Sequence, residues 1–297
     1  MSRVQDYRRA VGHLASAQKP GAGVPPYTRF VNRPMGRRLA AAAHVVGLSP
    51  DQVTAVSVLA SSVGLALLTL LAPSVSLGLL IGFLMVLGYA LDSADGQLAR
   101  LRGGGGPSGE WLDHVSDQAR HGAMHACVLI YLFRFLPDLP PLWLLVPMAY
   151  GVSSSTRFLS QILAEQLRRR TVSERPRASG AAPAGSSHAA THGDTGARLR
   201  ACCHLPADPG VLCLTFALSG LPAWFFVAYT ALCVLNTAST VVSLARKRTQ
   251  LRALDPGPAA DTGAPFTAGR RPDGRGTTGT SGRARRRDRP KQTNPSS

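Results

Sequence analysis

Long apolar runs constrain the fold of this chain more than any other feature of its sequence. The 33 Lys and Arg residues and the 16 Asp and Glu residues lie almost entirely outside these runs. An apolar stretch of about 20 residues with few charges has the length of a helix that crosses the hydrocarbon core of a membrane. The sequence therefore predicts an all-α, polytopic membrane helix bundle.

Short breaks divide the apolar sequence into six expected transmembrane helices. Ala72-Pro73 ends the first, and a proline-rich turn at 137–141 follows the third. Ser219-Gly220-Leu221-Pro222 divides the last apolar block into a hairpin of two short spans. The expected spans are 53–71, 74–91, 113 to about 135, 142–163 and two within 211–245.

The segments outside the spans are basic. Residues 1–32 form a basic N-terminal segment, and Arg33 to Val46 are expected to form an interfacial amphipathic helix, although this helix could equally pack on the bundle. Residues 33–245 then make up the membrane domain, with a mobile cytoplasmic loop at about 164–209. Residues 246–297 are expected to be a basic, disordered tail.

Charge predicts the orientation of the spans. Residues 1–50 carry eight Arg and Lys, the loop at 164–209 carries seven Arg, and the chain from 246 onward carries thirteen Arg and Lys. With six spans, these segments share one face, so both termini and the loop are expected in the cytoplasm, at the plasma membrane. The basic run RARRRDRPK in the tail has no interleaved aromatic residues of the kind that bind nucleic acid, so an anionic membrane surface is the expected partner of the tail.

One stretch outside the apolar runs carries chemistry. From Asp92 to Asp117 the sequence reads D-x2-D-G-x2-A-R-x8-G-x3-D-x3-D, with two pairs of carboxylates at helical spacing. Four acids at neighbouring helix ends repel one another unless cations bind between them. Gly96 leaves room beside the first pair, and Arg100 offers a guanidinium to a phosphate.

This skeleton resembles the signature of the CDP-alcohol phosphatidyltransferase family (class I), whose members are integral membrane enzymes. The resemblance implies transfer of a phosphatidyl-type group from a CDP-alcohol, with CDP-diacylglycerol expected, to a hydroxyl acceptor with release of CMP, in phospholipid biosynthesis. It implies two Mg²⁺ or Mn²⁺ ions on Asp92, Asp95, Asp113 and Asp117, with Asp117 also the base on the acceptor hydroxyl. Family members are often homodimers.

The resemblance also suggests residues that contact the substrates. Gly96 and Arg100 would line the CDP-alcohol pocket, and the turn before the first span would add Asp51, Gln52 and Thr54. A simple helix N-cap is the alternative interpretation of that turn. Arg157, within the fourth span, is expected to bind an acceptor phosphate, which favours a phosphorylated polyol such as glycerol phosphate or inositol phosphate.

Other polar residues near the motif have open roles. His121 lies one turn after Asp117 and could support it, line a cavity or form an interhelical hydrogen bond. Arg120 could steer phosphate or reach lipid headgroups. Two other function classes compete with the enzyme. A divalent-cation transporter would need acids in the middle of the membrane and a repeat of the motif. A catalytically inactive membrane scaffold would not need all four aspartates.

Overall fold

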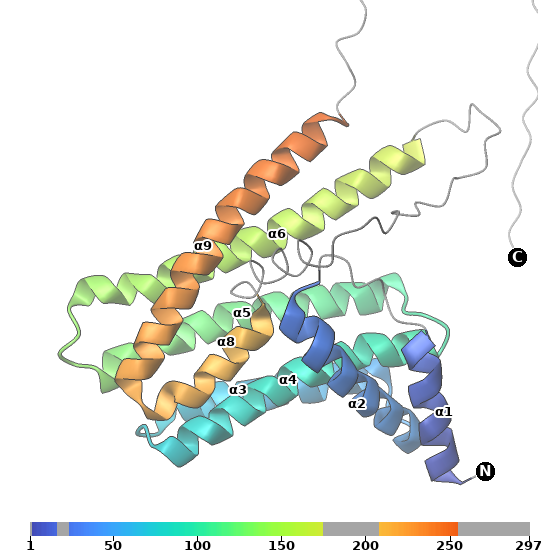
Figure 1. The fold of residues 1–297 in the computed structure, drawn as a ribbon, viewed down its shortest axis with the longest axis horizontal. Helices are drawn as coiled ribbons and strands as arrows, with labels where there is room; N and C mark the ends of the chain where they lie inside the picture. Colours follow the sequence, from blue (N-terminus) through green and yellow to red (C-terminus); the bar gives the residue numbers. More distant parts are fainter. Residues whose placement is uncertain (1, 17–23, 175–207, 255–297) are drawn as a thin grey trace, which may run out of the picture. The chain divides into compact units, whose positions relative to one another are not determined.

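The computed structural model describes residues 2–16, 24–174 and 208–254, and all regular structure within these residues is helical (Figure 1). This result confirms the predicted all-α class. The region expected to be a mobile loop is described only up to 174 and again from 208, and most of the expected tail lies outside the described residues.

The N-terminal part of the chain forms two helices, of which the sequence predicted only the second. The helix α2 (Arg33–Val46) has the predicted bounds and follows a π-helical turn, η1 (Thr28–Asn32), without a break. It ends at Gly47, whose φ of 89° is a left-handed conformation that favours glycine. The helix α1 (Arg3–Ser16) lies in the segment expected only to be basic, and it packs on α2.

The next two helices form the most extensively packed pair. The helix α3 (Pro50–Leu70) begins with a capping box between Ser49 and Gln52, and α4 (Val75–Leu101) begins at the N-cap Ser74. Their backbones approach closely where Ser57 Oγ donates a 2.8 Å hydrogen bond to the Gly88 carbonyl. A Cβ at Gly88 would lie 2.1 Å from Ser61 Oγ, so glycine permits this contact.

The remaining helices complete the bundle. They are α5 (Pro107–Phe135), the turn η2 (Pro141–Leu144), α6 (Leu145–Glu174), α8 (Pro209–Thr215), η4 (Phe216–Gly220) and α9 (Pro222–Arg252). The break at Leu221 lies where the last apolar block was expected to divide. Met85 from α4, Val128 from α5 and Phe225 from α9 are among the fully buried residues of the core.

Two helices continue beyond their expected ends. The helix α6 was expected to end at 163 but runs to Glu174, and α9 was expected to end at 245 but runs to Arg252. Hydropathy marks only the apolar part of a helix, whereas the polar residues that follow contain no Gly or Pro to end it. The two extensions lie side by side, joined by a hydrogen bond from Arg168 to Gln250 (Figure 1).

Three of the described helices, α3, α4 and α9, are long and apolar enough to cross a membrane. Large apolar side chains point outward along the bundle, including Phe83 of α4, which is 61% exposed, and Phe133 of α5, which is 72% exposed. Polar residues lower the hydropathy of α5 and α6, and α8 with η4 is shorter. The count of six spans stays a prediction.

Candidate active site

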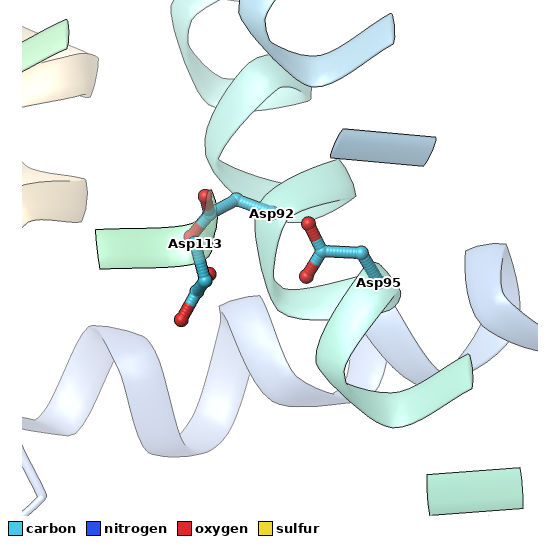
Figure 2. A group of neighbouring side chains, drawn as sticks. All are labelled: Asp92, Asp95 and Asp113. Carbon is cyan, nitrogen blue, oxygen red and sulfur yellow. The ribbon is translucent and has the colours of Figure 1, made fainter. Parts of the chain in front are cut away.

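Three of the four predicted aspartates converge between two helices. Asp92 and Asp95 lie on α4, Asp113 lies on α5, and one carboxylate oxygen from each lies within 4.8 Å of the others. Figure 2 shows their side chains entering the same space from the two helices. Three carboxylates offer the hard oxygen ligands that Mg²⁺ and Mn²⁺ prefer, so this group fits a divalent metal ion.

The turn between α4 and α5 explains how the two acid pairs meet. Residues 103–106 are all glycine, and Gly103 and Gly104 have φ values of 100° and 107°. These left-handed conformations end α4 and reverse the chain, and Pro107 then starts α5. Asp95 therefore faces a residue eighteen positions later in the sequence, Asp113.

Asp117, the fourth predicted aspartate, lies one turn after Asp113 and beside an arginine. The Arg120 guanidinium donates a 2.7 Å hydrogen bond to Asp92 and lies 3.6 Å from Asp117, and the Arg120 side chain is only 5% exposed. Of the two roles left open for Arg120, contact with lipid headgroups does not fit this burial. The guanidinium instead neutralises charge within the acid cluster.

Thr54 contacts the acid cluster directly. Its hydroxyl donates a 2.5 Å hydrogen bond to Oδ2 of Asp95, and the Gly96 backbone N–H donates a 2.5 Å hydrogen bond to Oδ1. Both oxygens of the Asp95 carboxylate therefore have a donor that orients them, and each keeps a lone pair for another ligand. The structure places Thr54 as a support for Asp95.

The other two residues predicted from the same turn, Asp51 and Gln52, are exposed. The Gln52 side chain accepts a 2.8 Å hydrogen bond from the Ser49 backbone N–H and thereby completes the cap of α3. The alternative interpretation of this turn as an N-cap therefore holds for Gln52. A role for Asp51 and Gln52 in binding the nucleotide stays a prediction.

Gly96 and Arg100 lie one turn apart on α4. Gly96 is exposed, and a Cβ at this position would meet only the Arg100 guanidinium, at 3.7 Å. The buried Nε of Arg100 has no hydrogen-bond partner in the described part of the chain. Gly96 therefore leaves open space beside the acid cluster, and Arg100 offers a guanidinium donor to an anion that enters it.

A cavity of about 450 Å³ opens next to the acid cluster. Arg157 of α6 lines it, and the buried Nη1 of this arginine has no hydrogen-bond partner among the described residues. The other polar side chains around the cavity include Asp92, Asp117, Arg120, Gln161 and Asn236. Much of the polar lining of this cavity thus comes from α5 and α6, the two long helices whose hydropathy is too low for a membrane-spanning helix by composition alone.

A second cavity, of about 640 Å³, lies between the start of α5 and the polar extensions of α6 and α9. Asp117, Phe158 and Gln161 line both cavities, so Asp117 stands where the two adjoin. Glu110, Arg168 and Lys247 are among the charged residues around the second cavity. The α6 and α9 extensions, which were not expected from hydropathy, therefore form part of the site.

Among the lining residues of the first cavity that sequence reasoning missed are Thr28, Tyr89 and Asp208. Tyr89 lies one turn before Asp92 on α4, whereas Thr28 and Asp208 come from distant parts of the chain and have no spacing that relates them to the aspartate motif. His121 lines the first cavity, as one of its expected roles predicted, and its Nδ1 lies 2.8 Å from the Asp117 backbone carbonyl, not from the carboxylate. His125 is hydrogen bonded to the Tyr229 hydroxyl, which is an interhelical contact.

Part of the sequence matches a known protein family. Residues 48–181 match the family model described as CDP-alcohol phosphatidyltransferase. No curated protein sequence matched the chain. A solved structure, of a Mycobacterium tuberculosis phosphatidylinositol phosphate synthase with CDP-DAG bound, has a TM-score of 0.49 and 20% sequence identity, and the match covers 77% of this chain and 98% of that chain.

Residues 48–181 therefore form a CDP-alcohol phosphatidyltransferase domain, and the acid cluster lies within them. The resemblance inferred from the aspartate motif is confirmed over residues 48–181, which contain α3, α4 and α5. The activity of the class is transfer of a substituted phosphate group from a CDP-alcohol in phospholipid synthesis.

Proposed function

We propose that this enzyme transfers the phosphatidyl group of CDP-diacylglycerol to a hydroxyl of a phosphorylated polyol and releases CMP. The observation that carries the proposal is the convergence of Asp92 with Asp95 and Asp113, because Asp92 also lines a cavity together with Asp117 and Arg157. A carboxylate cluster, a candidate base and a cation for the acceptor thus occur around one space.

The reaction exchanges one bond at phosphorus. The acceptor hydroxyl oxygen forms a bond to the phosphorus that carries diacylglycerol, and the bond from this phosphorus to the oxygen shared with CMP breaks. CMP leaves with that oxygen. The hydroxyl proton passes to a carboxylate oxygen of Asp117, which is 25% exposed and lines the cavity.

Asp92, Asp95 and Asp113 would hold Mg²⁺ or Mn²⁺, and Asp117 would complete a site for two ions. Such ions, when bound, supply positive charge that stabilises the attacking and leaving oxygens of a phosphoryl transfer. Thr54 and the Gly96 N–H orient Asp95 for this purpose. A carboxylate that is already oriented loses less conformational freedom when it takes up a ligand.

Gly96 and Arg100 are proposed to bind the donor. The free Nε of Arg100 can donate to a phosphate oxygen, and the absence of a side chain at Gly96 lets the diphosphate approach the backbone of α4. The apolar residues Leu79, Leu80 and Phe83 are exposed earlier on the same helix. Their surface suits the acyl chains of CDP-diacylglycerol, which would remain in the hydrocarbon layer.

Arg157 is proposed to bind the phosphate of the acceptor. It is partly buried, lines the same cavity as Asp117, and keeps a free donor at Nη1. A guanidinium in these surroundings pairs well with phosphate, which favours a phosphorylated polyol over an uncharged one. The basic segments support a position of the site on the cytoplasmic side of the plasma membrane, where a soluble acceptor is available.

CMP release by the purified protein in detergent tests this function. The assay contains CDP-diacylglycerol, Mg²⁺ or Mn²⁺ and, in separate reactions, glycerol 3-phosphate, inositol 1-phosphate, inositol or serine. We expect release that stops on chelation of the metal and depends on a phosphorylated polyol. Asp117→Asn should abolish it, whereas the matched control Asp138→Asn, in an exposed turn at the other end of α5, should not.

Each part of the proposal can fail separately. No CMP release with any acceptor would contradict the reaction, and release with serine or inositol alone would contradict the acceptor class. Release that survives chelation would exclude a role for metal ions. Unchanged CMP release in Asp117→Asn would contradict the role of Asp117 as the base.

A further inference from the structure

A hydrogen-bonded connection joins two distant parts of the chain at the wall of the first cavity. Asp208, which is 1% exposed, accepts a 2.9 Å hydrogen bond from the Thr28 backbone N–H and a 2.8 Å hydrogen bond from the Thr28 hydroxyl. These residues are 180 positions apart. Asp208 also accepts a 3.1 Å hydrogen bond from the Gly210 N–H, which fixes its carboxylate at the start of α8.

The connection continues to Tyr89 with a defined direction. The Thr28 hydroxyl and the Tyr89 hydroxyl are 2.9 Å apart. A threonine hydroxyl has one proton, and Thr28 gives this proton to the Asp208 carboxylate, which in ionised form can only accept. The Tyr89 hydroxyl must therefore donate to Thr28. The phenolic oxygen of Tyr89 is left with acceptor capacity and no proton of its own to offer.

Tyr89 stands next to the reacting groups. It lies one turn before Asp92 on α4, and both residues line the cavity that contains Asp117 and Arg157. The Tyr27 ring stacks on the Tyr89 ring with their centroids 6.4 Å apart, which holds the phenol in place. A residue that lines the space proposed for the acceptor therefore carries an oriented oxygen that can only accept hydrogen bonds.

We propose that Tyr89 determines acceptor specificity by accepting a hydrogen bond from a non-reacting hydroxyl of the polyol. Thr28 and Asp208 are positioning residues that impose the direction of the Tyr89 hydroxyl. Arg157 binds the phosphate, Asp117 takes the proton of the reacting hydroxyl, and Tyr89 accepts a hydrogen bond from a further hydroxyl. This assignment rests on the proposed function, and it distinguishes a polyol phosphate from a phosphorylated alcohol that has only the reacting hydroxyl.

The test compares two phosphorylated acceptors. Values of kcat/KM for CMP release are measured with glycerol 3-phosphate or inositol 1-phosphate, and with 2-hydroxyethyl phosphate, which has a single hydroxyl. We expect the wild type to prefer the polyol phosphate. Tyr89→Phe should lower this preference about tenfold, the effect of losing one hydrogen bond in a desolvated site, with little change for 2-hydroxyethyl phosphate.

Two further variants separate positioning from structure. Thr28→Val keeps the shape of the side chain but removes the hydroxyl, so it should lower the preference as Tyr89→Phe does, whereas Thr28→Ser should retain it. Tyr131→Phe is the matched control, because Tyr131 donates to the Ser219 carbonyl in the core and does not line the cavity. Its preference should equal that of the wild type even if its stability falls.

The outcomes separate this inference from the function on which it rests. Absence of CMP release by the wild type with every acceptor would overturn the proposed function and the role of Tyr89 with it. Turnover by the wild type with an equal preference in Tyr89→Phe would overturn only the role of Tyr89. An equal loss of preference in Thr28→Val and Thr28→Ser would remove the positioning role of the Thr28 hydroxyl.

Discussion

The Arg120 guanidinium donates a 2.7 Å hydrogen bond to the Asp92 carboxylate, and the two side chains are only 5% and 13% exposed. A proposed metal ligand thus has a buried cation as its partner. The same guanidinium lies 3.6 Å from Asp117, which links the metal cluster to the proposed base. Removing one member of a buried ion pair leaves the other charge uncompensated.

Arg120→Gln is therefore expected to destabilise the metal-free protein by about 3–5 kcal/mol. Bound Mg²⁺ would compensate Asp92 in place of the guanidinium, so the increase in Tm on adding Mg²⁺ should be larger in Arg120→Gln than in the wild type. Thermal unfolding in detergent, in chelator and in Mg²⁺, measures both effects. Arg169→Gln, which breaks only exposed ion pairs with Glu110 and Glu165, is the control. Equal Mg²⁺-induced increases in all three proteins would contradict this account.

Thr54→Val tests the support of Asp95. The substitution preserves the volume of the side chain but removes the 2.5 Å hydrogen bond to Asp95, so Mn²⁺ affinity should fall about 10–100-fold. Calorimetric Mn²⁺ titration measures this, and the Mg²⁺ concentration for half-maximal CMP release should rise in parallel. Thr54→Ser should restore most of the affinity. In the control Thr69→Val, the lost hydrogen bonds are to carbonyls of α3 itself and not to an acid. A loss of Mn²⁺ affinity in this variant would indicate a general effect on the helix.

Arg157→Gln tests acceptor binding. Loss of a charge-assisted hydrogen bond to phosphate should raise KM for the phosphorylated acceptor about 10–100-fold, with KM for CDP-diacylglycerol nearly unchanged. The KM of Arg157→Lys for the phosphorylated acceptor should lie between those of the wild type and Arg157→Gln, because an ammonium keeps the charge but not the planar fork of donors. Arg134→Gln is the control, since Arg134 is exposed and donates to the Thr69 carbonyl. Equal increases in KM for both substrates would assign Arg157 to the structure of the bundle.

Gly82→Ala tests the packing of α4 on η4. The new Cβ would lie 2.6 Å from the Ala217 Cβ and 2.8 Å from the Ala217 backbone nitrogen, so the elements must separate. Overpacking of this kind costs about 1–3 kcal/mol, which should lower Tm. Gly122→Ala on α5 is the matched control: nothing lies within 4 Å of its Cβ, and alanine favours a helix. A Tm for Gly82→Ala at or above that of the wild type would show that the contact is not tight.

Local sequence features predicted most of the helix boundaries for a physical reason. Proline restricts the backbone and glycine frees it, so these residues interrupt helices whatever surrounds them. The interruptions are at Pro73, at the glycines 103–106 and at Ser219-Gly220-Leu221-Pro222. The ends of α6 and α9 were predicted too early, because hydropathy reports where the apolar surface stops and not where the helix stops.

The sequence by itself determined the all-α class, the family and the acid cluster, because the motif and its glycine turn are local. Only the tertiary structure decided which side chains support that cluster. Thr54 reaches Asp95 across 41 positions, and Asp208 reaches Thr28 across 180. No periodicity encodes such pairs, since they arise from the packing of separate helices. The direction of the hydrogen bond from Tyr89 follows from that packing, because one proton on Thr28 can satisfy only one acceptor.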